Sequence, residues 1–131
     1  MPATIQDFDA YLNRTGKYGR VQRQKLLYAV QHFSVYCDGG FLAFDSPCFA
    51  DKLGPVFPDL GKNRKGNPAN LDARQKWLCD AVLKEIGHLS GKALADRSHK
   101  LYPEWQLARN RGNKRIYYRD IRQNLTPFLA F

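Results

Sequence analysis

The chain has 131 residues, of which 44% are hydrophobic and 13% aromatic. This length fits one domain, and the composition excludes a disordered chain, which would be poorer in apolar residues. The three cysteines lack CxxC spacing, which argues against a disulfide framework or zinc ribbon and favours a cytoplasmic location. No apolar run has the roughly 18 residues of a membrane span, and we expect no secretory signal and no membrane partner.

The net charge of +9 lies entirely after residue 60. Residues 1–60 hold six basic and six acidic side chains, whereas the remainder holds 15 basic and six acidic ones. A one-sided positive charge attracts nucleic acid or an acidic protein surface. Composition alone does not distinguish the two.

Two helices are predicted in the first third of the chain. Thr4 and Asp7 resemble a capping box, and apolar residues follow at helical spacing, which predicts a helix near residues 4–13. The clearest helix ends before Gly39-Gly40 and carries one apolar stripe: Leu26, Leu27, Val30, Phe33 and Cys37. Much of its polar side is expected to be Gln22, Arg23, Gln31 and Ser34.

A small β-hairpin is predicted next. The apolar runs 41–44 and 48–50 are separated by Asp45-Ser46-Pro47, which are turn-forming residues. Gly54-Pro55 then predicts a bend and a short helix that reaches Leu60. Residues 61–70 have the composition of a flexible basic loop.

The second half of the chain predicts further helices. One runs from about residue 71 to 86, with Asn70 as its cap, Trp77 in its buried face and Gly87 at its end. Others run from Ser90 to about residue 99 and from about 118 to near 127, with a short turn at 103–107 and a basic turn at 109–115. The fold class is mainly α with a small β-hairpin, a compact single-domain bundle of five to six helices over residues 1–131.

Four short motifs occur in a fixed order. Residues 24–29 read QKLLYA, residues 52–56 read KLGPV, and residues 89–94 read LSGKAL. Ser98 and His99 then precede Pro103 and Trp105. In order and spacing this pattern resembles the Panacea antitoxin domain family, with its SocA-like and phage-associated GepA-like members, over about residues 9–109. Leu53 stands where that family usually has an aromatic residue, and Glu104 separates Pro103 from Trp105.

The resemblance implies an antitoxin of a toxin–antitoxin system, which neutralises a cognate toxin by direct protein–protein binding. Some members of the family present the toxin to a protease, so a protease or chaperone is a second expected partner. A nucleic-acid-binding transcriptional regulator is the alternative that the positive charge favours. A phage-encoded anti-defence protein is a third alternative.

The sequence lacks the patterns of common catalytic and metal sites. It contains no GxSxG, HExxH or Gly-rich phosphate loop. Ser98 and His99 are adjacent and point about 100° apart on a helix, so they cannot pair with each other. His32 and Cys37 lie about 140° apart on their helix, which does not suit a shared metal. We therefore expect no enzyme, no metal and no cofactor.

Nine side chains are candidates for partner binding. Lys25, Tyr28 and His32 are expected on the side of their helix away from the apolar stripe. Trp105 lies in an irregular segment, where core packing and partner contact are equally expected. The others form a basic run beside Tyr117 and Tyr118 that docks a toxin, contacts phosphates, or is simply solvated. This run is Arg109, Arg111, Lys114, Arg115 and Arg119, followed by Arg122.

Overall fold

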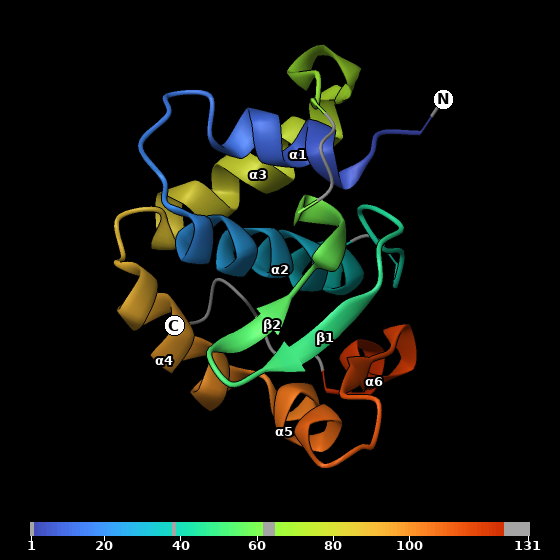
Figure 1. Cartoon of the computed structure of the whole chain (residues 1–131). Coiled ribbons are helices and arrows are strands. Elements are labelled where there is room, and N and C mark those ends of the chain that lie inside the picture. Colours follow the sequence, from blue (N-terminus) through green and yellow to red (C-terminus); the bar gives the residue numbers. More distant parts are fainter. Residues whose placement is uncertain (1, 38, 62–64, 125–131) are drawn as a thin grey trace.

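The computed structural model describes residues 2–37, 39–61 and 65–124, and Figure 1 shows a long central helix surrounded by shorter elements. The helices are α1 (Ile5–Leu12), α2 (Arg20–Cys37), α3 (Ala73–Ile86), α4 (Gly91–Leu101), α5 (Pro103–Arg109) and α6 (Tyr118–Gln123). Short 3-10 helices span Pro58–Gly61 and Pro68–Asn70. The strands are β1 (Cys48–Asp51), β2 (Gly54–Val56) and β3 (Arg115–Ile116). The predicted fold class, mainly α with a small hairpin, is confirmed.

The central helix α2 is covered by α1, α3, α4, α6 and β2. Every residue from Lys25 to Val35 is buried, including Gln31 and Ser34, which were expected on a polar side. A helix covered on most sides buries polar side chains as well as apolar ones, and these need hydrogen-bond partners. The apolar stripe is therefore correct, but the exposed polar side is wrong for this part of the helix.

The side chain of Gln31 determines the path of the loop after α2. Its amide oxygen accepts from the backbone N–H groups of Ala43 (2.7 Å) and Phe44 (3.2 Å). Its amide nitrogen donates to the Phe44 carbonyl at 2.7 Å. The glutamine thus satisfies backbone groups that a strand would otherwise pair with a neighbouring strand.

The β-hairpin exists, but its strands differ from those predicted. β1 pairs antiparallel with β2, and Ala50 lies opposite Pro55. On its other edge, β1 pairs with β3, which gives the strand order β2-β1-β3. Residues 41–44 are not a strand, because Gln31 binds their backbone. The segment from Gly54 is therefore a strand first and a 3-10 helix only from Pro58.

Helix starts follow local capping chemistry. Thr4 caps α1 in a complete capping box, and Ser90 caps α4 by accepting from the backbone N–H of Ala93, both as predicted. Asp72, not Asn70, caps α3, since its carboxylate accepts from the third residue of the helix. Asn70 is the last residue of a 3-10 helix instead.

Trp77 was predicted in the core, and this is wrong. The buried face of α3 is formed by Leu78, Cys79, Val82 and Ile86, and Trp77 lies at its edge with 45% of its surface exposed. Its ring packs against Phe33 at 5.6 Å between centroids. The helix ends at Gly87, as predicted.

The last predicted helix begins at Tyr118, as expected. Its predicted end near residue 127 lies outside the described residues. Cys48 and Cys79 are buried as small apolar side chains, as predicted, whereas Cys37 is half-buried. Within the described part of the chain, no helix is long and apolar enough to cross a membrane.

Candidate partner-binding site

Side chains from three helices hold the turn between β1 and β2. From α2, the Lys25 ammonium donates to the Pro55 carbonyl at 2.9 Å. From α5, the Trp105 indole N–H donates to the Asp51 carbonyl at 2.7 Å. Two residues singled out from the sequence, more than 70 positions apart, therefore meet at one turn.

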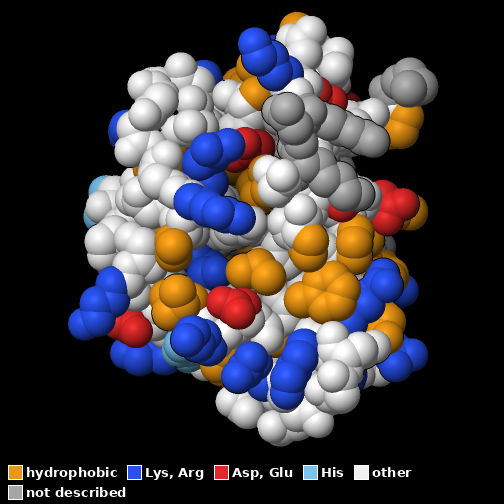
Figure 2. Space-filling view, viewed as in Figure 1, with side chains coloured by type: hydrophobic (Ala, Val, Ile, Leu, Met, Phe, Trp, Pro, Cys, Tyr) orange, Lys and Arg blue, Asp and Glu red, His pale blue; other side chains and the backbone are white. Residues whose placement is uncertain are grey.

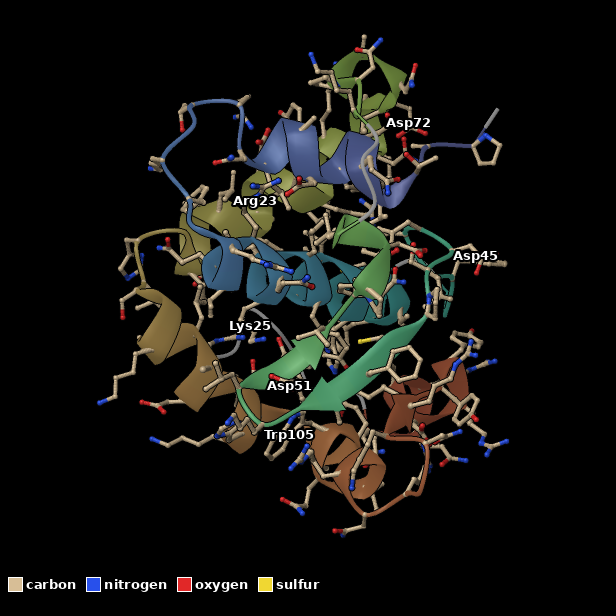
Figure 3. All side chains as sticks on the ribbon, in the orientation of Figure 1. Arg23, Lys25, Asp45, Asp51, Asp72 and Trp105 are labelled. Atoms are coloured by element: carbon tan, nitrogen blue, oxygen red, sulfur yellow. The ribbon has the colours of Figure 1, made fainter. Side chains whose placement is uncertain are left out.

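Further contacts from α4 and α5 complete this arrangement. The His99 ring stacks on Trp105 with 4.2 Å between centroids, and its Nε2 lies 3.1 Å from the Lys52 carbonyl. The Arg109 guanidinium donates to the Ala50 carbonyl at 3.1 Å. Trp105 and Arg109 therefore hold the hairpin in position, and Trp105 lies below it in the view of Figure 3.

Gly54 allows the turn to approach α2 and α4 closely. Its φ is +118°, and a Cβ atom built on it would lie 2.9 Å from Lys25 Cε and 3.2 Å from Ser98 Cβ. A side chain there would be strained by the backbone angle and would also displace Lys25. Close packing of the turn against α2 and α4 thus explains why the KLGPV motif has glycine at position 54.

A hollow of about 260 Å³ lies between α2 and this hairpin. We call it the hairpin groove, and its principal lining residues are Arg20, Val21, Lys25, Asp51, Leu53 and Val56. Figure 2 shows apolar side chains gathered on this face, with Lys and Arg side chains around them. Its margin combines exposed apolar groups with charge: Val21 is 39% exposed and Leu53 is 47% exposed.

Lys25 forms the polar floor of the hairpin groove, between α2 and β2 (Figure 3). Only 4% of its surface is exposed, and burial lowers its pKa from 10.5 to about 8, while the Asp51 charge acts in the opposite direction. Among the described residues, Lys25 makes one hydrogen bond, to the Pro55 carbonyl, and no ion pair. The ammonium therefore faces the groove incompletely paired.

Within the basic run, Arg111 and Lys114 have structural roles in addition to Arg109. Arg111 forms a bidentate ion pair with Asp120, which lowers the pKa of that carboxyl group. Lys114 Nζ donates to the Arg109 carbonyl at 2.5 Å. These contacts fix the turn between α5 and α6, so Arg111 and Lys114 are partly used within the fold.

Arg115 and Arg119 are exposed and flank Tyr117. Their guanidinium carbons lie 5.1 and 5.0 Å from the Tyr117 ring centroid, and that of Arg111 lies at 5.4 Å. We call Arg111, Arg115, Tyr117 and Arg119 the arginine–tyrosine cluster. It is separate in the sequence from the hairpin groove, and no residue is common to the two.

Tyr28 and His32 were expected to lie open to a partner, and this is wrong. They are 0% and 1% exposed, because Phe57, Tyr102 and Glu104 pack against this side of α2. Lys25 is buried too, although it lines the hairpin groove. Tyr28 instead donates to Glu104 Oε2 at 2.6 Å, inside the core.

Glu104 is the centre of a buried polar cluster. It is fully buried, and burial raises its pKa from 4.5 to about 7, while the hydrogen bond from Tyr28 opposes the rise. Its Oε2 lies 3.6 Å from His32 Nε2. Burial of the His32 ring lowers the pKa of this histidine from 6.5 to about 4. His32 Nε2 and Glu104 Oε1 have no hydrogen-bond partner among the described residues.

Several groove residues carried no functional signal in the sequence. Leu53 was treated as a core substitution for an aromatic residue, yet it is exposed at the hairpin tip. Val21 precedes the apolar stripe of α2 and follows no motif. Glu104 resembles an ordinary acidic residue in the first turn of a helix, which is usually exposed. The positions of these residues at the groove or in the core become evident only in the folded structure.

The chain was compared with protein-family models, with curated proteins and with solved structures, and none of these matches it.

Proposed function

We propose that this protein is an antitoxin-type binding protein, which neutralises a cognate toxin through direct contact at the hairpin groove. The observation that carries the proposal is the meeting of three of the four family-like motifs around one turn. Lys25 of QKLLYA bonds to Pro55 of KLGPV. Gln24, from the same motif as Lys25, accepts from the Phe57 N–H at 2.7 Å and donates to its carbonyl at 3.2 Å.

The last motif, Ser98-His99 with Pro103 and Trp105, reaches the same place. Ser98 packs where a side chain at position 54 would stand, and His99 stacks on Trp105, whose indole bonds to the hairpin. Motifs that are far apart in the chain but cooperate in one structural unit support the resemblance to the Panacea domain. Gln24, Ser98 and His99 serve to hold the hairpin in place, whereas Lys25, Leu53 and Val56 of the same motifs line the hairpin groove.

The surface that this arrangement presents suits a protein partner. Leu53 and Val21 are exposed beside the buried Lys25 cation and the exposed Arg20. Exposed apolar residues at the rim of a pocket are common anchors in protein interfaces, and a nearby positive charge selects acidic partners.

Co-expression tests the proposal. We expect the product of an adjacent gene to stop growth alone and the protein to restore it. Leu53→Asp should abolish the rescue, because it places a charge in the apolar rim of the hairpin groove. Leu107→Asp is the matched control, since Leu107 is 50% exposed on α5 and does not line the groove. A harmless neighbour, or equal rescue by both variants, would remove the proposal.

The arginine–tyrosine cluster supports a second candidate, nucleic-acid binding. Three guanidinium groups lie within 5.4 Å of the Tyr117 ring centroid, in the half of the chain that carries the net charge of +9. Arginines contact phosphates and aromatic rings stack on bases. Binding should then weaken with salt at a log–log slope of about −0.9 per phosphate contact, and Arg115→Gln with Arg119→Gln should reduce that slope. A slope unchanged by the double variant contradicts this candidate.

A further inference from the structure

Lys25 carries the feature from which the inference begins. An ammonium group has three N–H donors, and one of them bonds to the Pro55 carbonyl. The other two have no bond to any described residue, although the side chain is only 4% exposed. A buried, incompletely paired cation is unfavourable, and a carboxylate within reach would relieve it.

The acidic side chain whose charge acts on Lys25 does not serve this purpose. Asp51 lies on the rim of the hairpin groove and is exposed, and it makes no ion pair with Lys25. Its influence on Lys25 is through space only. No residue in the described part of the chain therefore supplies a counterion for Lys25. The hairpin groove, which Lys25 lines, gives access to its ammonium group.

Apart from Gln24, whose amide is bonded to the Phe57 backbone, the remaining side chains that line the hairpin groove are apolar or positive. Val21, Leu53 and Val56 form the apolar wall, and Arg20 lies exposed at the margin. The volume of about 260 Å³ is below the roughly 300–1,000 Å³ typical of sites for drug-sized ligands. An occupant of one or two side chains fits this space better than a cofactor does.

We propose that the hairpin groove is a carboxylate-recognition site, which binds an apolar residue followed by an acidic residue in an extended segment of the protein partner. The carboxylate pairs with the free donors of Lys25 and with Arg20. The apolar side chain packs against Val21, Leu53 and Val56. This inference rests on the proposed function for its partner and specifies the chemistry by which that partner is chosen.

Two dipeptide probes that differ in one charge test the site. N-acetyl-leucyl-glutamate amide and N-acetyl-leucyl-glutamine amide are titrated into the whole chain, and the backbone amide resonances of Leu53, Gly54 and Val56 are followed by NMR. We expect the acidic probe to bind in the millimolar range and the neutral probe to bind about tenfold more weakly. Equal affinities for the two probes, or binding of neither, would overturn the inference.

Variants assign the discrimination to the predicted groups. Lys25→Met should remove the preference for the acidic probe while retaining the apolar contacts. Arg20→Gln, at an exposed position, should weaken the acidic probe about two- to threefold, on the order of one exposed ion pair. Lys100→Met is the control, because Lys100 is exposed on α4 and lies outside the groove. A preference that survives Lys25→Met, or one that Lys100→Met removes equally, contradicts the assignment.

The probe experiment contains no toxin, so its outcome separates two failures. Loss of probe discrimination with intact toxin neutralisation would sink the carboxylate site alone. Intact discrimination without neutralisation would sink the antitoxin function and leave the site standing.

Discussion

At the scale of single residues, Lys25 combines a structural bond with an unsatisfied charge. The lysine stem packs against Gly54, and the ammonium bonds to Pro55. Burying a cation without a counterion costs free energy, and this cost is retained here at the floor of the hairpin groove. Residues that are costly to the fold and line a hollow are good candidates for function.

A substitution at Lys25 tests this cost. Lys25→Met keeps the buried stem and removes the charge, so we expect the free energy of unfolding to stay within about 1 kcal/mol of the parent or to rise. The lost bond to the Pro55 carbonyl offsets part of the gain. Urea denaturation measures the difference, and a loss above about 3 kcal/mol would show that the ammonium is well paired.

The pair of Glu104 and His32 predicts how stability depends on pH. The pKa of Glu104 is raised to about 7, so the folded chain binds a proton that the unfolded chain releases above pH 4.5. Its contribution is fully present below pH 4.5 and is lost as pH rises toward 7. The pKa of His32 is lowered from 6.5 to about 4, so its contribution is present above pH 6.5 and is lost as pH falls toward 4.

These two effects oppose each other over most of this range, and variants separate them. Glu104→Gln should gain stability relative to the parent as pH rises from 4.5 to about 7 and remain constant above it. His32→Gln should gain relative to the parent as pH falls from 6.5 to about 4. Urea midpoints across this range measure both differences, and parallel pH profiles of parent and variants would contradict the burial of this pair.

At the scale of elements, the Gln31 side chain makes the backbone hydrogen bonds that a neighbouring strand would otherwise make. Gln31 binds the backbone of the loop after α2 with three hydrogen bonds. Gln24 binds the chain after β2 in the same manner. The central helix therefore fixes both segments that flank the hairpin, and the hairpin groove depends on this support.

Gln31→Leu should unfold the chain more easily, because it leaves three backbone groups without partners in the core. Each buried unpaired group costs about 1–3 kcal/mol, so a loss of at least ~3 kcal/mol is expected. Gln106→Leu is the control, since Gln106 is exposed on α5. Thermal unfolding followed by circular dichroism compares the two, and similar melting temperatures would refute the role of Gln31.

Helix boundaries could be predicted from the sequence because their causes are local. Thr4, Ser90 and Gly87 act within a few residues of their own positions. The strands of the hairpin could not be predicted, because the competing bonds come from Gln31, on another element. Burial of Tyr28 was missed for the same reason, since Phe57, Tyr102 and Glu104 pack against it only in the folded chain.

At the scale of the whole molecule, the candidate site was predicted in part. The QKLLYA and KLGPV motifs lie in the segment that forms the hairpin groove. Lys25, Trp105 and Arg109, which were predicted to bind a partner, contact the hairpin, and their part in partner binding stays a prediction. Leu53 and Val21 were missed because an exposed apolar residue has no sequence signature. The separation of the hairpin groove from the arginine–tyrosine cluster also required the fold.

The central claim is that the hairpin groove binds a protein partner directly. Isothermal titration of the purified chain with the purified toxin candidate, encoded beside it, measures this. We expect saturable binding that Leu53→Asp weakens about 30-fold or more, a loss of ~2 kcal/mol, and that Leu107→Asp leaves within about twofold. Unchanged affinity of the Leu53→Asp variant, or equal losses in both variants, would contradict the account.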